Sequence, residues 1–149
     1  IRTASTDKAI KCVTDGGVLL HYDDAQKLAT TSSGISVTGA IVDSTHGNVR
    51  DIPATSKSSG YTLVAGDFGK VVYISTGGVT IPNSVMSGGN VVTIINNSGS
   101  DQTITQASGL TLYNTADAST GNRTLAGRGM ATIWFQGGST AYIGGAGLS

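Results

Sequence analysis

The feature that most constrains the fold of this chain is a series of short β-branched runs separated by glycine-rich turns. From residue 61 onward such runs recur about every 8–12 residues, which is the spacing of strands in sandwiches and barrels. The predicted strands are Tyr61–Val64, Val71–Ser75, Val79–Ile81, Val91–Asn96, Gln102–Gln106, Leu110–Tyr113, Arg123–Leu125, Met130–Gln136 and Thr140–Ile143. Turn residues such as Thr76–Gly78 and Asn97–Ser100 separate them. The pattern predicts an all-β protein.

Composition supports this prediction and argues against catalysis. The chain has no Glu, and Gly, Thr and Ser make up 59 of its 149 residues. Thr, Val and Ile favour strands, whereas Glu, Lys, Leu and Ala fill helices. The absence of Glu also removes the best general acid for sugar or acyl chemistry. We therefore expect a non-enzymatic protein with no catalytic residues and no cofactor.

Charge and cysteine usage exclude several kinds of partner. Nine basic and nine acidic residues balance, and no basic stripe is visible, so nucleic acid is not an expected partner. No apolar run approaches the ~20 residues of a membrane span, so no membrane insertion is expected. Cys12 stands alone, which excludes an intrachain disulfide and a C-x-x-C metal site. It is expected to be a small buried residue.

The chain is expected to have three parts. Residues 1–42 form a β-strand stem, residues 43–60 form a polar linker that contains Pro53, and residues 61–149 form an antiparallel, jelly-roll-like β-sandwich. The stem strands are predicted at Ile10–Val13, Val18–Tyr22, Leu28–Thr31 and Ile35–Thr38, with turns at Asp15–Gly17, Asp23–Lys27 and Ser32–Gly34. A few short strands cannot bury a core. The stem must therefore pack on the sandwich or intertwine with other copies of the chain.

The order of these segments resembles that of the tail fibre proteins of tailed bacteriophages. Asp15–Gly39, with the sequence DGGVLLHYDDAQKLATTSSGISVTG, resembles the strand-turn-strand strap of these fibres. Gly47–Pro53 is similar to the joint that follows the strap. The remaining similar segments, which resemble a C-terminal β domain, are Tyr61–Lys70, Gly78–Pro82, Asn96–Gln106 and Thr120–Gly129. The resemblance covers about residues 8–148.

The resemblance implies a homotrimeric receptor-binding fibre on the phage tail or elsewhere on the exterior of the virion. Its implied partners are sister chains, other virion proteins and host-cell-surface polysaccharide. One alternative is a capsid-associated head fibre or decoration protein without a receptor role. Another is a polysaccharide depolymerase spike. The second alternative is disfavoured because such an enzyme needs two suitably spaced carboxyl groups, and the nine Asp residues lie almost entirely in turns.

Aromatic residues provide the candidates for glycan binding. Sugar rings stack on aromatic side chains, while their hydroxyl groups need amide and guanidinium partners. The predicted glycan-binding residues are Tyr113, Asn114, Asn122, Arg123, Trp134 and Tyr142, with Gln136 nearby. An alternative interpretation places Trp134 and Phe135 in the core, one on each face of a strand.

The sequence predicts no metal site. Asp23 and Asp24 are expected to form a turn rather than a carboxylate pair. His21 and His46 lie far apart in the sequence and in no ligand-spaced cluster. His21, on a predicted strand, could meet its copies only on the axis of a trimer.

Overall fold

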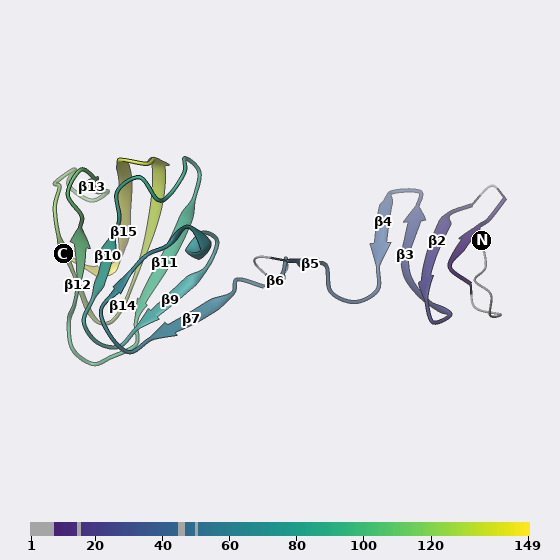
Figure 1. Ribbon diagram of the computed structural model, residues 1–149, viewed down its shortest axis with the longest axis horizontal. Coiled ribbons are helices and arrows are strands. Elements are labelled where there is room, and N and C mark those ends of the chain that lie inside the picture. Colours follow the sequence, from purple (N-terminus) through teal and green to yellow (C-terminus); the bar gives the residue numbers. More distant parts are fainter. Residues whose placement is uncertain (1–7, 15, 45–46, 50) are drawn as a thin grey trace. The chain divides into compact units, whose positions relative to one another are not determined.

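The computed structural model describes residues 8–14, 16–44, 47–49 and 51–149 (Figure 1). Asp15 of the first predicted turn and His46 lie outside the described residues. Strands account for 56% of the chain, and the one helical element of the described part is a 3-10 turn, η1 (Ala65–Asp67). The prediction of a nearly all-β protein is confirmed. The chain divides into two compact units, Ile1–Asp43 with Asn48–Arg50, and Ser44–Gly47 with Asp51–Ser149.

The first unit contains a four-stranded antiparallel sheet. Its strands lie in the order β1 (Ile10–Cys12), β2 (Val18–Tyr22), β3 (Ala25–Thr31) and β4 (Gly34–Val37). The β2–β3 turn needs only Asp23 and Asp24, both with positive φ, as in two-residue hairpin loops. Strand β3 therefore begins at Ala25, earlier than predicted. Two short strands, β5 (Val42–Asp43) and β6 (Gly47–Asn48), form a separate pair.

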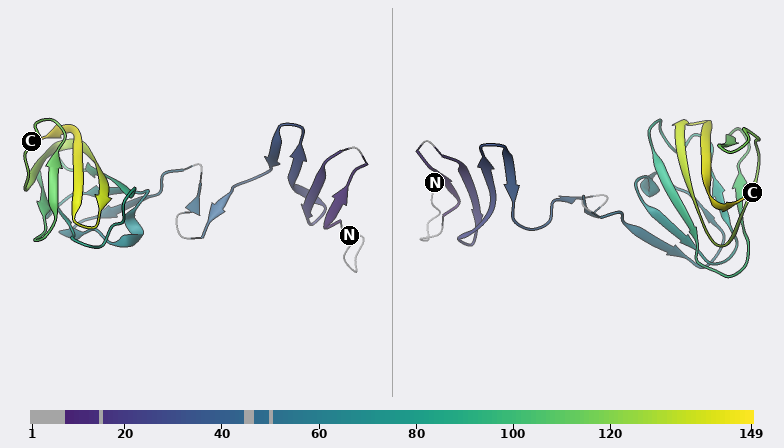
Figure 2. Two further views of the ribbon diagram at one scale, coloured as in Figure 1. Left: turned by 90° about the horizontal axis from the view of Figure 1, so that it is seen from above. Right: turned by 180° about the vertical axis from the view of Figure 1, so that it is seen from behind.

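In the first part of the second unit, the chain winds in successive turns whose strands pair in parallel. Its strands alternate between two rows: β7 (Ala54–Lys57), β9 (Val71–Ile74) and β11 (Val91–Asn96) pair in parallel, and so do β8 (Tyr61–Thr62), β10 (Val79–Ile81) and β12 (Gln102–Gln106). Each turn of the chain therefore adds one strand to each row. Figure 2 shows these strands curling round a common interior.

A long strand then joins the two rows. Strand β14 (Arg123–Gly137) pairs antiparallel with β12 through its first residues and with β11 through Met130–Trp134. The sheet order becomes β7-β9-β11-β14-β12-β10-β8, which is nearly closed. Strand β15 (Thr140–Leu148) lies antiparallel to β14, and β13 (Thr111–Asn114) lies parallel to β15.

Two predictions about this unit are wrong. The sheet is mixed rather than antiparallel, because among its described strand pairs five are parallel and three antiparallel. The reason is that the neighbour of most strands lies one full coil away, not across a hairpin. Residues 43–60 are also not linker throughout, because Ala54–Lys57 pairs with Val71–Ile74 as a sheet strand.

Among the described residues, the cluster of buried apolar side chains lies in the second unit. Alternate residues of the central strands point inward, so that Ile94 and Ile133 are fully buried while Thr93 and Thr132 face outward. The buried apolar cluster consists of Leu63, Val72, Ile74, Val79, Ile81, Met86, Val92, Ile94, Ile104, Leu110, Leu112, Leu125, Ala131, Ile133, Phe135, Ala141 and Ile143. This interior gives the second unit the means to fold without help.

Candidate interaction surfaces

The sheet of the first unit has one apolar face. Register places Ile10 opposite Leu20, Leu20 opposite Leu28, and Leu28 opposite Val37, and residues opposite one another share a face. We call this the strap face. It comprises Ile10, Cys12, Val18, Leu20, Tyr22, Ala25, Leu28, Thr30, Ile35 and Val37. Nine of its ten residues are apolar or aromatic, which is the composition of a face that packs against something.

Within the first unit, no described residue covers the strap face well. Val18, Leu20 and Ile35 are 39%, 38% and 66% exposed, and Cys12, expected to be buried, is also exposed. Among the described residues of this unit, the one buried apolar side chain is Ala29, on the opposite face. Fully burying a Val, Leu or Ile side chain stabilises a protein by roughly 1.5–3 kcal/mol. Burial of the strap face against a partner surface would therefore stabilise the first unit.

His21 does not share the strap face. It alternates with Leu20 along β2, and its partial burial matches that of Leu19 rather than that of Leu20. If the strap faces of several copies point to a common axis, His21 points away from it. A metal held by copies of His21 does not fit this sheet. Within the described parts of the chain, no group of three potential metal ligands is present.

The second unit carries a row of aromatic side chains on the outside of its sheet. Register places Val91 opposite Trp134, Trp134 opposite Tyr142, and Tyr142 opposite Tyr113, across β11, β14, β15 and β13. We call these four residues the aromatic strip. The Tyr113 and Tyr142 rings stack at 5.4 Å between centroids, and the Trp134 and Tyr142 centroids lie 6.0 Å apart. Trp134 is 45% exposed, so the alternative that buries it is wrong, whereas Phe135 is fully buried.

Uncharged polar groups border the aromatic strip on both sides. On one side lie Gln136, Thr140 and Thr111, each two positions along its strand from a residue of the strip. The Tyr142 hydroxyl donates to Gln136 Oε1 at 3.2 Å. On the other side lie Thr93 and Thr132, whose hydroxyl oxygens are 3.0 Å apart. The strip therefore combines ring surface with hydroxyl and amide groups.

Three predicted glycan-binding residues are not part of the strip. Asn114 follows Tyr113 in the strand, so it faces inward and is buried, with its Oδ1 accepting from the Ala116 N–H. The Asn122 Oδ1 accepts from the Gln106 N–H, and the Arg123 guanidinium donates to Ser119. The structure thus brings together the predicted rings and separates them from these predicted polar partners.

The strip's actual polar partners were not evident from the sequence. Gln136 was noted as a neighbour, but Thr111, Thr140, Thr93 and Thr132 were not. They reach the rings because β13 pairs in parallel with β15, and because β14 pairs with β11. Neither pairing has a local signal in the sequence.

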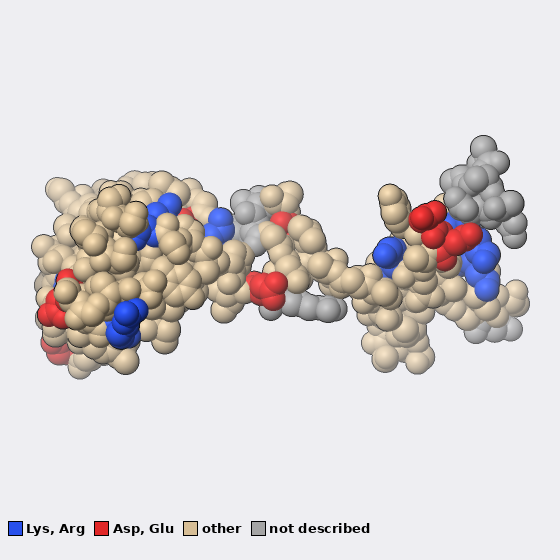
Figure 3. Space-filling model, turned by 90° about the horizontal axis from the view of Figure 1, so that it is seen from below, with Lys and Arg blue, Asp and Glu red and all other residues tan. Residues whose placement is uncertain are grey.

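Three exposed acidic residues accept hydrogen bonds in turns. Asp24 Oδ1 accepts from the Lys8 N–H, Asp101 Oδ1 from the Gly127 N–H, and Asp117 Oδ1 from the Ser119 N–H and hydroxyl. The Ser119 hydrogen bonds lower the pKa of Asp117, with Arg123 adding to the effect. In the view of Figure 3, charged residues are few and scattered over the second unit.

One carboxylate, that of Asp67, is buried. Its Oδ2 accepts from the Tyr61 hydroxyl at 2.9 Å and from the Val64 N–H at 2.8 Å. Burial of Tyr61, followed by the hydrogen bond and the charge of Asp67, raises the pKa of Tyr61 to about 12. The Lys57 ammonium lies 4.0 Å from the centroid of the same ring. These contacts tie η1 to the first coil and suggest a structural role.

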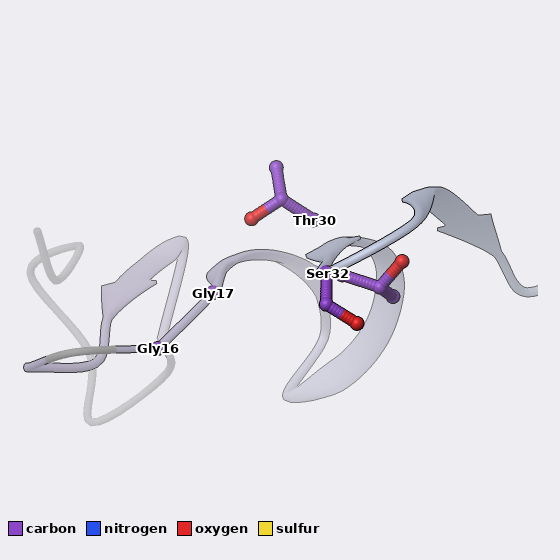
Figure 4. Close-up of a pocket in the computed structure, with 5 residues that line it drawn as sticks. Gly16, Gly17, Thr30 and Ser32 are labelled. Carbon is purple, nitrogen blue, oxygen red and sulfur yellow. The ribbon is translucent and has the colours of Figure 1, made fainter.

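A small hollow in the first unit provides no candidate for chemistry. Gly16, Gly17, Thr30, Thr31 and Ser32 line it, with a volume of about 260 Å³ (Figure 4). Its lining offers hydroxyl and backbone groups but no ionisable side chain. Over the described ranges there is also no helix long and apolar enough to cross a membrane.

Comparison of this chain with protein-family models and with curated proteins finds no match. Its function must therefore be argued from its own two surfaces.

Proposed function

We propose that this chain is a non-enzymatic fibre segment of a tailed bacteriophage, that it works as a homotrimer, and that it attaches the virion to host-cell glycan. The observation that carries the proposal is the uncovered strap face. A sheet with one apolar face must bury that face against another element. The fibre-like order of segments in the sequence supports sister chains as the partner, and a virion exterior as the location.

Three strap faces turned toward a common axis would form the missing core. The row of Ile10, Leu20, Leu28 and Val37 crosses all four strands, so each copy offers a continuous apolar band. Lys11 and Ser36 lie on the opposite face and would stay in water. Each chain of the trimer would also present one aromatic strip, so that three weak contacts act together and raise avidity.

The proposal is tested by the mass of the chain in solution. We expect light scattering at micromolar concentration to give three times the 15.0 kDa of one chain. Leu20→Asp places a charge in the strap face and should dissociate the trimer, because a buried unpaired charge is costly. Ser36→Asp, on the opposite face, is the matched control and should leave the trimer intact. A monomeric wild-type chain would contradict the proposal.

Attachment is tested separately, with fluorescently labelled trimer and candidate host cells. Surface binding that polysaccharide extract from the same cells competes away supports the adhesive role. A stable trimer that binds no host surface would instead favour the capsid-associated head fibre or decoration protein.

A further inference from the structure

We infer that the aromatic strip binds an extended, uncharged polysaccharide, which lies along the strip, across the strands, and is gripped within its chain rather than at its end. This inference rests on the proposed attachment function and names the class of glycan and the manner of its binding. It follows from the shape of the strip, its polar borders and its lack of charge.

The shape of the strip suits a linear polymer. Strands lie about 4.8 Å apart, so the row from Val91 to Tyr113 extends for roughly 14 Å across three strand spacings. At the Val91 end the apolar surface continues, because Gly69 N donates to Val91 O and places Phe68, 37% exposed, nearby. At the other end an antiparallel bridge places Thr120 beside Tyr113, so the row continues onto an uncharged hydroxyl residue. The row therefore spans more than one sugar unit, which suits contacts within a polymer rather than at its end.

The borders of the strip suit sugar hydroxyl groups. The Tyr113 and Tyr142 rings stack on each other, so the C–H groups of a sugar would meet mainly the exposed Trp134 ring and the outer edges of the two tyrosines. Thr111 and Thr140 on one side and Thr132 on the other can donate and accept hydrogen bonds. The Gln136 Oε1 accepts from Tyr142, and its amide N–H groups donate to none of the described residues. These N–H groups are available to a ligand oxygen.

The strip and the next two rows on its Thr93 side carry no charged residue. The outward residues of these three rows are Val91, Trp134, Tyr142 and Tyr113; Ala54, Val71, Thr93, Thr132 and Gly144; and Ser56, Tyr73, Ile95, Met130 and Ala146. A ligand carrying carboxylate or phosphate groups would find no cation there to replace its hydration. The surface therefore selects an uncharged glycan.

The same features favour a glycan over a second protein copy at this surface. Thr93 and Thr132 partner each other, but a flat copy-to-copy contact would bury the Thr111 and Thr140 hydroxyl groups against rings that offer few partners. Burying hydroxyl groups without partners costs free energy. A polysaccharide brings its own hydroxyl groups, which can form hydrogen bonds with these threonine hydroxyl groups.

The test uses the full-length trimer and an array of purified linear polysaccharides, with dextran and mannan among the neutral members and hyaluronan and colominic acid among the anionic ones. We expect binding to a neutral member that is unchanged between about 50 and about 500 mM NaCl, because no ion pair contributes. Blocking both ends of size-graded fragments of that polymer should not reduce binding. Trp134→Ala and Tyr142→Ala should each weaken it by about tenfold or more.

Two controls distinguish the possible failures. Tyr73→Ala removes a ring from the same face two rows away and should leave binding unchanged. Light scattering on every variant reports assembly independently. Binding to anionic members alone, to no member, or only through chain ends overturns the inference, although an intact trimer leaves the proposed fibre assembly standing. A Trp134→Ala variant that dissociates into monomers would show that the strip is an interface between copies, and would also overturn it.

Discussion

The two units of this chain reach order by different routes. The second unit surrounds seventeen buried apolar residues with a nearly closed sheet. The first unit has a sheet with regular hydrogen bonding, yet among its described residues only Ala29 is both apolar and buried. Strand pairing alone therefore does not make a domain. What the first unit lacks is a second layer, and that lack is the main indication of how the protein works.

The largest effect expected from a substitution in the core is that of Phe135→Ala. The Phe135 side chain is fully buried, so the variant should lose about 3–5 kcal/mol of unfolding free energy in denaturant titration. The adjacent Trp134→Ala, on the outer face, should lose less than about 1.5 kcal/mol. Equal losses would contradict the inside–outside assignment of β14.

A somewhat smaller loss is expected from Asn96→Ala. Asn96 is buried, and its Nδ2 lies within 3.0 Å of the Ser100, Leu125 and Ala126 carbonyl oxygens. Removing the amide takes the donor away from the buried Leu125 carbonyl oxygen, at a cost of about 1–3 kcal/mol. The loss should be independent of protein concentration, because it lies within one chain. A concentration-dependent loss would mean that the second unit also needs partner chains.

Leu28→Ala tests the first unit, whose stability is expected to depend on partner chains. In an assembled trimer it should lower the midpoint of thermal unfolding and make that midpoint depend more steeply on protein concentration, since binding and folding are linked. The expected loss is about 2 kcal/mol, at the lower end for a buried Leu. Calorimetry at two concentrations measures it. The same loss at every concentration would show that Leu28 is stabilised within its own chain.

The smallest effect concerns alkaline pH. The pKa of Tyr61 is raised from 10.0 to about 12, mainly by burial and then by Asp67. Its protonated form is the one that the fold favours, so its contribution is full below about pH 10 and is lost as the pH rises through about 12. Tyr61→Phe should flatten this decline in unfolding free energy, while costing about 1 kcal/mol at neutral pH. An unchanged decline would show that other groups cause it.

Much of the local structure could be predicted from the sequence. Val79–Ile81, Val91–Asn96 and Gln102–Gln106 form strands with the predicted bounds, because turn residues limit each of them on both sides. The partners of these strands could not be predicted. Alternation determines which side chains face inward, but it does not determine whether the next strand pairs across a hairpin or one coil later.

A glycine-rich segment at the end of the second unit forms part of a strand that its sequence does not predict. Gly144–Gly147 lies beyond the predicted strand Thr140–Ile143, yet it belongs to β15. A Cβ at Gly145 would collide with the Met130 carbonyl oxygen, so the close approach of β14 requires glycine there. In the candidate site, Tyr113, Tyr142 and Trp134 lie next to one another. Their polar partners depend on the pairing of β13 with β15, which the sequence does not encode locally.

Hydrogen exchange of the full chain at a series of dilutions tests the central claim most directly. We predict that backbone amides of β1 to β4 are protected when the trimer is populated and lose protection as it dissociates, while amides of β9 to β15 remain protected throughout. Equal and concentration-independent protection of β1 to β4 in a monomeric chain would contradict the account.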